Sequence, residues 1–67
     1  MKVRRFEKIY QDGKIEVAWV GKVVGGIVIS AINYHEPQGE GDAHYVTILY
    51  SNGTSRRVFK PDCIDFD

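Results

Sequence analysis

Apolar and polar residues alternate along much of this chain with a period close to two residues. The alternation is clear in residues 14–20, where Ile15, Val17 and Trp19 fall on one face of an extended segment. Successive side chains of a β-strand point to opposite faces, so this pattern predicts a strand. Gln11-Asp12-Gly13 precedes it and has the composition of a turn.

The strongest local signal is a hairpin in the second half of the chain. Residues 45–50 alternate again, and residues 56–60 form a second β-patterned run. Asn52-Gly53 stands between them, and this dipeptide is typical of a type I′ hairpin turn. In the first run Val46, Ile48 and Tyr50 share one face, and the other face carries Tyr45, Thr47 and Leu49.

Residues 27–34 are apolar on both faces of the expected strand. Such a strand is normally covered on both sides. A long, bent strand that takes part in two half-sheets meets this condition, and Gly25-Gly26 at its start would ease the bend. The pattern therefore favours a barrel over an open sheet.

The two ends of the chain and one loop are harder to interpret. In residues 2–10, Val3, Phe6 and Tyr10 share a helical face, yet the segment is short and we favour a strand. Residues 35–43 are polar and exceed the usual connection of about 4–6 residues. Residues 60–63 suit a 3₁₀ or tight turn, and residues 64–66 a short last strand.

Composition limits the chain to one small domain. It has 67 residues, of which 43% are hydrophobic and 27% charged, which is typical of a globular chain. A domain of this size buries only about 60% of the surface that its unfolded chain exposes, so its core is thin. We therefore predict one all-β domain over residues 1–67, in which residues 1–13 form an additional N-terminal strand or an arm.

Charge and cysteine content restrict the expected class of ligand and the expected cellular compartment. Nine basic and nine acidic residues give a formal net charge of zero, so the strong positive charge of a general nucleic-acid binder is missing. Cys63 is the one cysteine, which excludes an intramolecular disulfide and fits a reducing compartment. No apolar run approaches the ~20 residues that span a bilayer. We expect a cytoplasmic protein that makes no contact with a membrane.

The sequence contains no catalytic signature. It lacks a nucleophile with a base, a carboxylate pair and a P-loop, since residues 21–26 do not end in Gly-Lys-Ser/Thr. We predict no enzyme activity and no cofactor; a small oligomeric enzyme with a shared pore is the least favoured option. The polar loop holds the one group of potential metal ligands, but a Gly-rich loop supports a metal site poorly, and we predict none: His35, Glu36, Glu40, Asp42 and His44.

Four short segments between residues 15 and 66 match the strand motifs of a known family: Ile15–Trp19, Gly26–Ile29, Tyr50–Gly53, and Val58 with Asp62–Ile64. In these segments the chain resembles the Tudor-like branch of the SH3-like barrels, and the resemblance implies a five-stranded SH3-like barrel. The opening strand of that family has an apolar-x-apolar-x-aromatic pattern, its second strand begins with Gly, its third ends in aromatic-x-Asp-Gly, and an apolar residue in its fourth precedes an Asp-x-Ile-like turn.

The resemblance implies a candidate ligand site. Tudor domains that read methyl-lysine hold the ammonium group in an aromatic cage by cation–π attraction. Carried over, Trp19 and Tyr50 would be two walls of the cage and Asn52 its polar rim. Val24 and Thr54 stand where other walls would be and supply no ring, so the resemblance implies poor binding of methyl-lysine.

We predict a non-catalytic interaction or adaptor module that binds a protein or peptide through an aromatic barrel rim. Aromatic residues and Arg dominate the binding energy of protein interfaces. The candidate contact residues are Trp19, Tyr34, Tyr45, Tyr50, Asn52 and Arg57. The alternative is a nucleic-acid-binding barrel with a local basic patch made of Arg4, Arg5, Arg57 and Lys60. A free strand edge, such as the N-terminal segment, would also allow β-augmentation or a homodimer.

Overall fold

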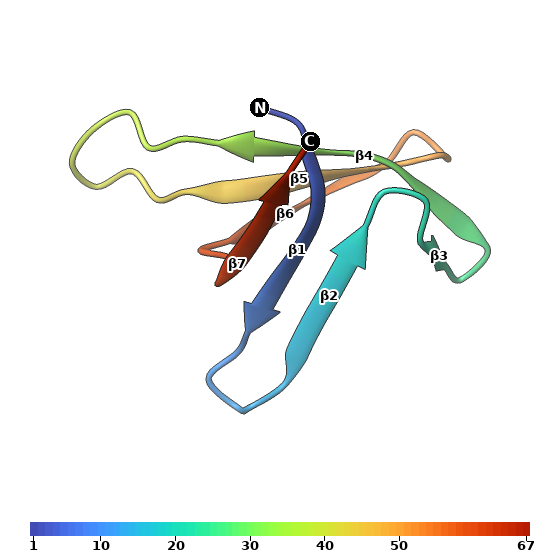
Figure 1. Ribbon diagram of the computed structural model, residues 1–67, viewed down its shortest axis with the longest axis horizontal. Helices are drawn as coiled ribbons and strands as arrows, with labels where there is room; N and C mark the ends of the chain where they lie inside the picture. Colours follow the sequence, from blue (N-terminus) through green and yellow to red (C-terminus); the bar gives the residue numbers. More distant parts are fainter.

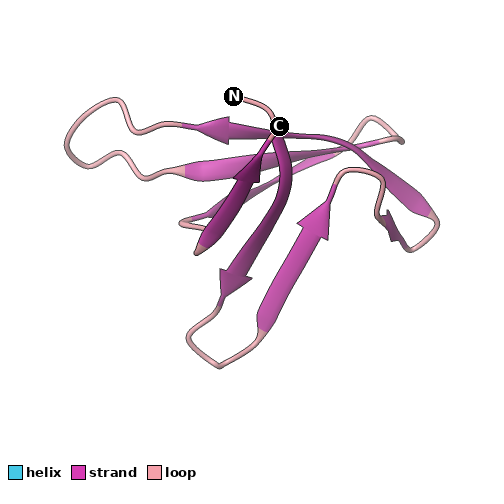
Figure 2. Cartoon of the chain, in the orientation of Figure 1, coloured by secondary structure: helices cyan, strands magenta, loops and turns pink.

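The computed structural model describes all residues, Met1–Asp67, and consists of strands and turns. It contains no helix that could cross a membrane. The strands are β1 (Val3–Ile9), β2 (Ile15–Trp19), β3 (Val23–Val24), β4 (Ile27–His35), β5 (Tyr45–Tyr50), β6 (Ser55–Phe59) and β7 (Cys63–Phe66). The predicted all-β class is confirmed, and Figure 2 shows that strands and loops account for the whole chain.

The strands form two antiparallel sheets. Their orders are β2-β1-β7 and β3-β4-β5-β6. In Figure 1 the longer strands of the second sheet run across the top, and the three-stranded sheet lies below them at a steep angle. The result is a curled, partly barrel-like domain. The expected count of five strands is not matched, because there are seven strands in two sheets.

The two additional strands are β1 and β3. β1 was expected as a strand on weak grounds, and it pairs with both β2 and β7. A register shift between Val3 and Arg5 interrupts its pairing with β7. Val3 and Phe6 are both buried although they are three positions apart, which a regular strand does not allow. The irregularity turns the strand so that both side chains point into the core. It also explains why the apolar residues of this segment are spaced as they would be in a helix.

One core joins the two sheets. Its eight buried side chains are Val3, Phe6, Ala18, Ile29, Ile32, Val46, Ile48 and Val58. β4 contains an irregularity of the same kind as β1. A register shift between Ile29 and Ala31 lets Ile29 and Ile32 both face the core. The bend expected in this strand therefore comes from an irregularity inside it. The Gly25-Gly26 pair has positive φ values of 57° and 81° and instead forms the turn that joins β3 to β4.

β2 presents its apolar face to solvent. Ala18 is buried, whereas Ile15 and Trp19 on the opposite face are 63% and 43% exposed. Ala18 lies beside β1, where it pairs with the fully buried Phe6, and its small side chain belongs to the core. The alternation predicted this strand correctly but did not show which of its faces meets the core.

One predicted turn has a different form, and of the two forms predicted for residues 60–63 the 3₁₀ turn is absent. A type I′ turn needs positive φ at both central residues, but in the β5–β6 hairpin Gly53 has φ 86° and Asn52 does not have a positive φ. Tyr50 and Thr54 close the loop instead, as in a three-residue hairpin with a glycine bulge, and the Asn52 side chain accepts hydrogen bonds from Thr54. The connection before β7 contains no 3₁₀ turn, and Lys60 adopts φ 52° there.

The beginning and end of the chain meet beside β4. Lys2 forms an isolated bridge with Asn33, and the Tyr34 N–H donates to the Met1 carbonyl at 2.8 Å. The Asp67 N–H donates to the Lys2 carbonyl at 3.2 Å. Figure 1 shows the two termini side by side at the top of the molecule.

Candidate binding surface

Three rings and one guanidinium group are in contact on the solvent side of the four-stranded sheet. The His35 and Tyr45 rings are stacked with 4.3 Å between their centroids, and the Phe59 ring lies 5.2 Å from Tyr45. The Arg57 guanidinium lies 4.7 Å from the centroid of Tyr45, a cation–π contact. We call these four residues the Tyr45 face. No element packs on it, and Phe59 remains 51% exposed.

Strand register explains this arrangement. Tyr45 pairs with His35 on β4 and with Phe59 on β6, so the three side chains stand on the same side of the sheet. Arg57 is two residues from Phe59 and therefore shares its face. His35 is also held from the loop, because its Nε2 lies 2.9 Å from Oδ2 of Asp42.

A groove runs from the Tyr45 face along the outer edge of β6. Its volume is about 660 Å³, which is within the range of ligand-binding clefts. One side is formed by the end of β1 and the turn after it, the other by β6, and we call it the β6 groove. The lining residues are Lys8, Ile9, Tyr10, Gln11, Asp12, Arg57, Val58 and Phe59.

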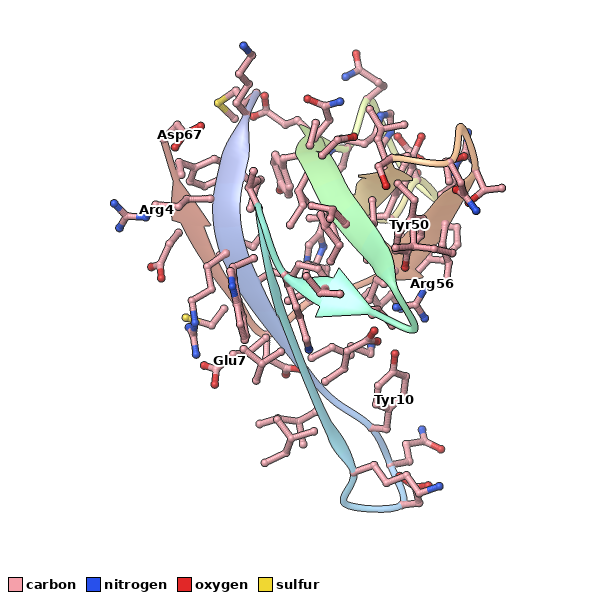
Figure 3. All side chains as sticks on the ribbon, turned by 90° about the vertical axis from the view of Figure 1, so that its right-hand side faces the viewer. Arg4, Glu7, Tyr10, Tyr50, Arg56 and Asp67 are labelled. Atoms are coloured by element: carbon pink, nitrogen blue, oxygen red, sulfur yellow. The ribbon has the colours of Figure 1, made fainter.

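A polar cluster connects β2 to β6 next to this groove. Arg56 forms an ion pair with Glu16, and the Tyr10 hydroxyl donates a hydrogen bond of 2.6 Å to Oε1 of Glu16. Figure 3 shows Tyr10, Arg56 and Tyr50 on the same side of the molecule. The link holds the β1–β2 hairpin in place over the four-stranded sheet, and so fixes the width of the groove.

The cluster also shifts two pKa values. The hydrogen bond to Glu16, together with partial burial and the charge of Glu16, raises the pKa of Tyr10. Burial opposes the charge of Arg56, but hydrogen bonds to Glu16 and Tyr50 outweigh it and raise the pKa of Arg56. Both shifts favour the hydrogen-bonded, ion-paired state at neutral pH.

The structure separates the predicted rim residues. Tyr45 and Arg57 are in contact on the Tyr45 face. Tyr34 instead packs against the core and meets Phe66 edge-on, with 5.4 Å between centroids. Asn52 belongs to the β5–β6 turn, where its side chain binds Thr54.

The two rings expected as cage walls each lie beside a cation of the chain itself. Lys22 Nζ lies 4.9 Å from the centroid of Trp19. Tyr50 is half-buried against the core, and it contributes to the raised pKa of Arg56. The Trp19 and Tyr50 rings do not contact each other.

The residues of the basic-patch alternative are also dispersed. Arg5 forms ion pairs with Glu7 at 3.3 Å and Asp65 at 3.8 Å. Arg4 belongs to the three-stranded sheet, while Arg57 is on β6 of the other sheet. In Figure 3, Arg4, Glu7 and Asp67 lie on the side away from Arg56.

Sequence reasoning identified Tyr45 and Arg57 but missed most of the other residues of this surface, among them the rings of His35, Phe59 and Tyr10 and the side chain of Ile9. Phe59 could have been found, because residues 57 and 59 share a strand face and the hairpin sets their register against Tyr45. Ile9 and Tyr10 had no such signal. Their place beside β6 depends on how the two sheets pack, which no local pattern reports.

A second apolar region lies around the β3–β4 hairpin. Its exposed side chains are Trp19, Val20, Val23, Val24 and Val28. The nearest hollow is about 170 Å³ in volume and is lined by parts of β1 and β4 and by both chain ends. The Tyr45 face and the β6 groove combine rings, cations and a larger concavity, so they are the better candidate site.

The potential metal ligands of the polar loop do not gather. No group of three or more His, Cys, Asp or Glu side chains lies close enough to hold a metal ion. His35 binds Asp42, while Nε2 of His44 lies 3.3 Å from the Pro61 carbonyl. Among known proteins, no family model, no curated protein and no solved structure matches this chain.

Proposed function

We propose that this chain is a non-catalytic protein-interaction module, and that its partner binds across the Tyr45 face and the adjoining β6 groove. The observation that carries the proposal is the contact of Arg57 and Phe59 with the Tyr45 ring on an uncovered sheet face. Aromatic residues and Arg are the types that most often dominate binding energy at interfaces. Here Arg57 and Phe59 both already contact the Tyr45 ring, so binding costs less additional side-chain entropy.

We propose also that the fold is a variant of the SH3-like barrel with a Tudor-like strand pattern. Two features support it: the consecutive antiparallel strands β4, β5 and β6, and the return of β7 to pair with β1. In this interpretation β1 is the first barrel strand, and the segment from β2 to β3 is an excursion before the long second strand. A fold of this kind hosts many functions and does not itself select one.

The experiment is an affinity pull-down from host lysate with three baits. Wild-type protein is compared with Tyr45→Ala, and with Leu49→Ala as the control on the same strand and the same face. Each bait is tested with and without nuclease, at low and moderate salt. We expect a protein partner that survives nuclease and salt, and whose recovery falls about tenfold with Tyr45→Ala alone.

Two results would contradict the proposal. Equal capture by wild type and Tyr45→Ala, with both proteins folded by circular dichroism, would remove the Tyr45 face from the interface. Recovery that disappears with nuclease or salt would identify a nucleic acid, since phosphate contacts weaken steeply as salt rises. The cations to substitute next would then be Arg4, Arg5, Arg57 and Lys60.

A further inference from the structure

β6 is an edge strand with free backbone groups. Its one partner is β5. The Lys60 N–H donates to the His44 carbonyl at 2.9 Å, which identifies these residues as a hydrogen-bonded pair. Such pairs alternate along an antiparallel ladder. The N–H and C=O groups of Ser55, Arg57 and Phe59 therefore point away from β5, toward the groove.

The β6 groove has the shape that an added strand needs. Its far wall contains Ile9 and Tyr10, which are 56% and 37% exposed, and Val58 lies at its base with 3% exposure. An extended chain along β6 would therefore contact apolar side chains on its inner side. On its outer side it would lie next to Arg57 and Phe59.

The charges around this edge are mostly positive and unpaired. Lys8, Arg57 and Lys60 have no carboxylate within ion-pair distance. Three acidic groups lie nearby, and each already has a partner within the chain: Glu16 forms an ion pair with Arg56, Asp62 accepts a 2.7 Å hydrogen bond from the Ile9 N–H, and Asp12 accepts a 3.0 Å hydrogen bond from the Lys14 N–H. Since the chain as a whole is neutral, this local excess selects for an acidic occupant.

We infer that the partner of the proposed module inserts an extended acidic segment that pairs antiparallel with β6 and becomes the fifth strand of the four-stranded sheet. The inference rests on the proposed function and gives its binding mode. Directly opposed side chains of antiparallel strands share a face. The segment therefore carries a carboxylate opposite Arg57, an apolar residue opposite Phe59, and between them an apolar residue opposite Val58 that contacts Ile9.

The test uses a capped synthetic peptide, acetyl-Ser-Thr-Val-Ile-Glu-Thr-Ser-amide, and the full chain. In the inferred register Val opposes Phe59, Ile opposes Val58 and Glu opposes Arg57. The N–H groups of Val and Glu then point at β6, and that of Ile points away. N-methylation of Val or Glu should weaken binding about tenfold or more by removing a backbone hydrogen bond, whereas N-methylation of Ile is the matched control and should change it less than about twofold.

A charge exchange tests the register separately. Arg57→Glu should weaken binding of the peptide that contains Glu, and it should strengthen binding of the same peptide with Lys in place of Glu. Arg4→Glu makes the same change in net charge on β1, outside the groove, and should leave the preference for Glu unchanged. In NMR spectra, saturating peptide should slow hydrogen exchange at the Arg57 and Phe59 amides.

Specific outcomes would overturn the inference. They are no binding at millimolar peptide, equal effects of all three N-methylations, or protection of the Arg57 amide that rises with protein concentration in the absence of peptide, which would indicate a second copy of the chain on β6. If the pull-down still depends on Tyr45 in any of these cases, the binding mode fails and the proposed function stands. Loss of the Tyr45 dependence would remove the proposed function as well.

Discussion

At the scale of single residues, Tyr10 supports the Glu16 carboxylate, which in turn joins the β1–β2 hairpin to Arg56 of the four-stranded sheet. Removing its hydroxyl in Tyr10→Phe leaves the ring in the groove and deletes one hydrogen bond to a carboxylate. We expect the free energy of unfolding to fall by about 0.5–1 kcal/mol, measured by denaturant titration at neutral pH. Tyr34→Phe is the control, because the Tyr34 hydroxyl makes none of the hydrogen bonds in the structure.

The same hydroxyl makes stability depend on alkaline pH. Because the pKa of Tyr10 is raised above its ordinary value of 10.0, the folded state holds this proton more tightly than the unfolded state does. Its contribution is therefore complete below pH 10 and is lost as the pH rises through the raised pKa. Tyr10→Phe should remove this part of the alkaline loss of stability, and an unchanged slope would contradict the assignment.

Asp42 organises the loop after β4. Its carboxylate accepts the Gln38 N–H and contacts His35, each at 2.9 Å, and these contacts lower its pKa. A lowered pKa means that the contribution of Asp42 is present above the ordinary value near 3.8 and is lost as the pH falls through the lower one. With Asp42→Ala we expect faster hydrogen exchange at the Gln38 amide.

The control for this loop is Glu40→Ala. Glu40 is an exposed carboxylate of the same loop and forms no ion pair. Its removal should leave the Gln38 amide unchanged. Equal exchange rates in the two variants would show that Asp42 does not hold the loop.

At the scale of secondary-structure elements, β2 and β6 belong to different sheets and meet through Glu16 and Arg56. A double-mutant cycle with Glu16→Ala and Arg56→Ala measures their coupling in the free energy of unfolding. We expect a coupling of about 1 kcal/mol, at the upper end of the range for a partly exposed pair, because Tyr10 adds a hydrogen bond to Glu16.

Lys14 and Asp12 provide the matched control for that cycle. Their side chains are 84% and 59% exposed and 4.0 Å apart. We expect no measurable coupling between them, as for many surface ion pairs. If the two cycles gave the same coupling, the Glu16–Arg56 link would not fix the β1–β2 hairpin.

Strands were predictable where a short turn sets their pairing. The β5–β6 hairpin could be located from Asn52-Gly53, although the turn itself has a different form. β1 could not be assigned firmly, because the irregularity between Val3 and Arg5 removes its strand period and only the neighbouring strands make it extended. The same holds for the candidate site. The positions of Tyr45 and Arg57 could be predicted from the β5–β6 hairpin, whereas the position of Tyr10 could not.

At the scale of the whole molecule, one thin core holds two sheets together. Ile32→Val removes a methylene from this core and should lower the free energy of unfolding by about 0.5–1.5 kcal/mol. Ile15→Val makes the same chemical change at a side chain that is 63% exposed, and it should stay within about 0.5 kcal/mol of wild type. Equal effects would mean that the core does not carry the stability of the domain.

The free edge of β6 has a cost as well as a use. Unpaired strand edges are templates for aggregation, and many proteins protect them with charge. If two copies paired through β6 in the register that covers the whole strand, Arg57 would stand directly opposite Arg57 of the other copy, and like charges there are destabilising. The guanidinium that selects an acidic partner therefore also discourages the strand from pairing with itself, so mutations that neutralise Arg57 would cost solubility together with specificity.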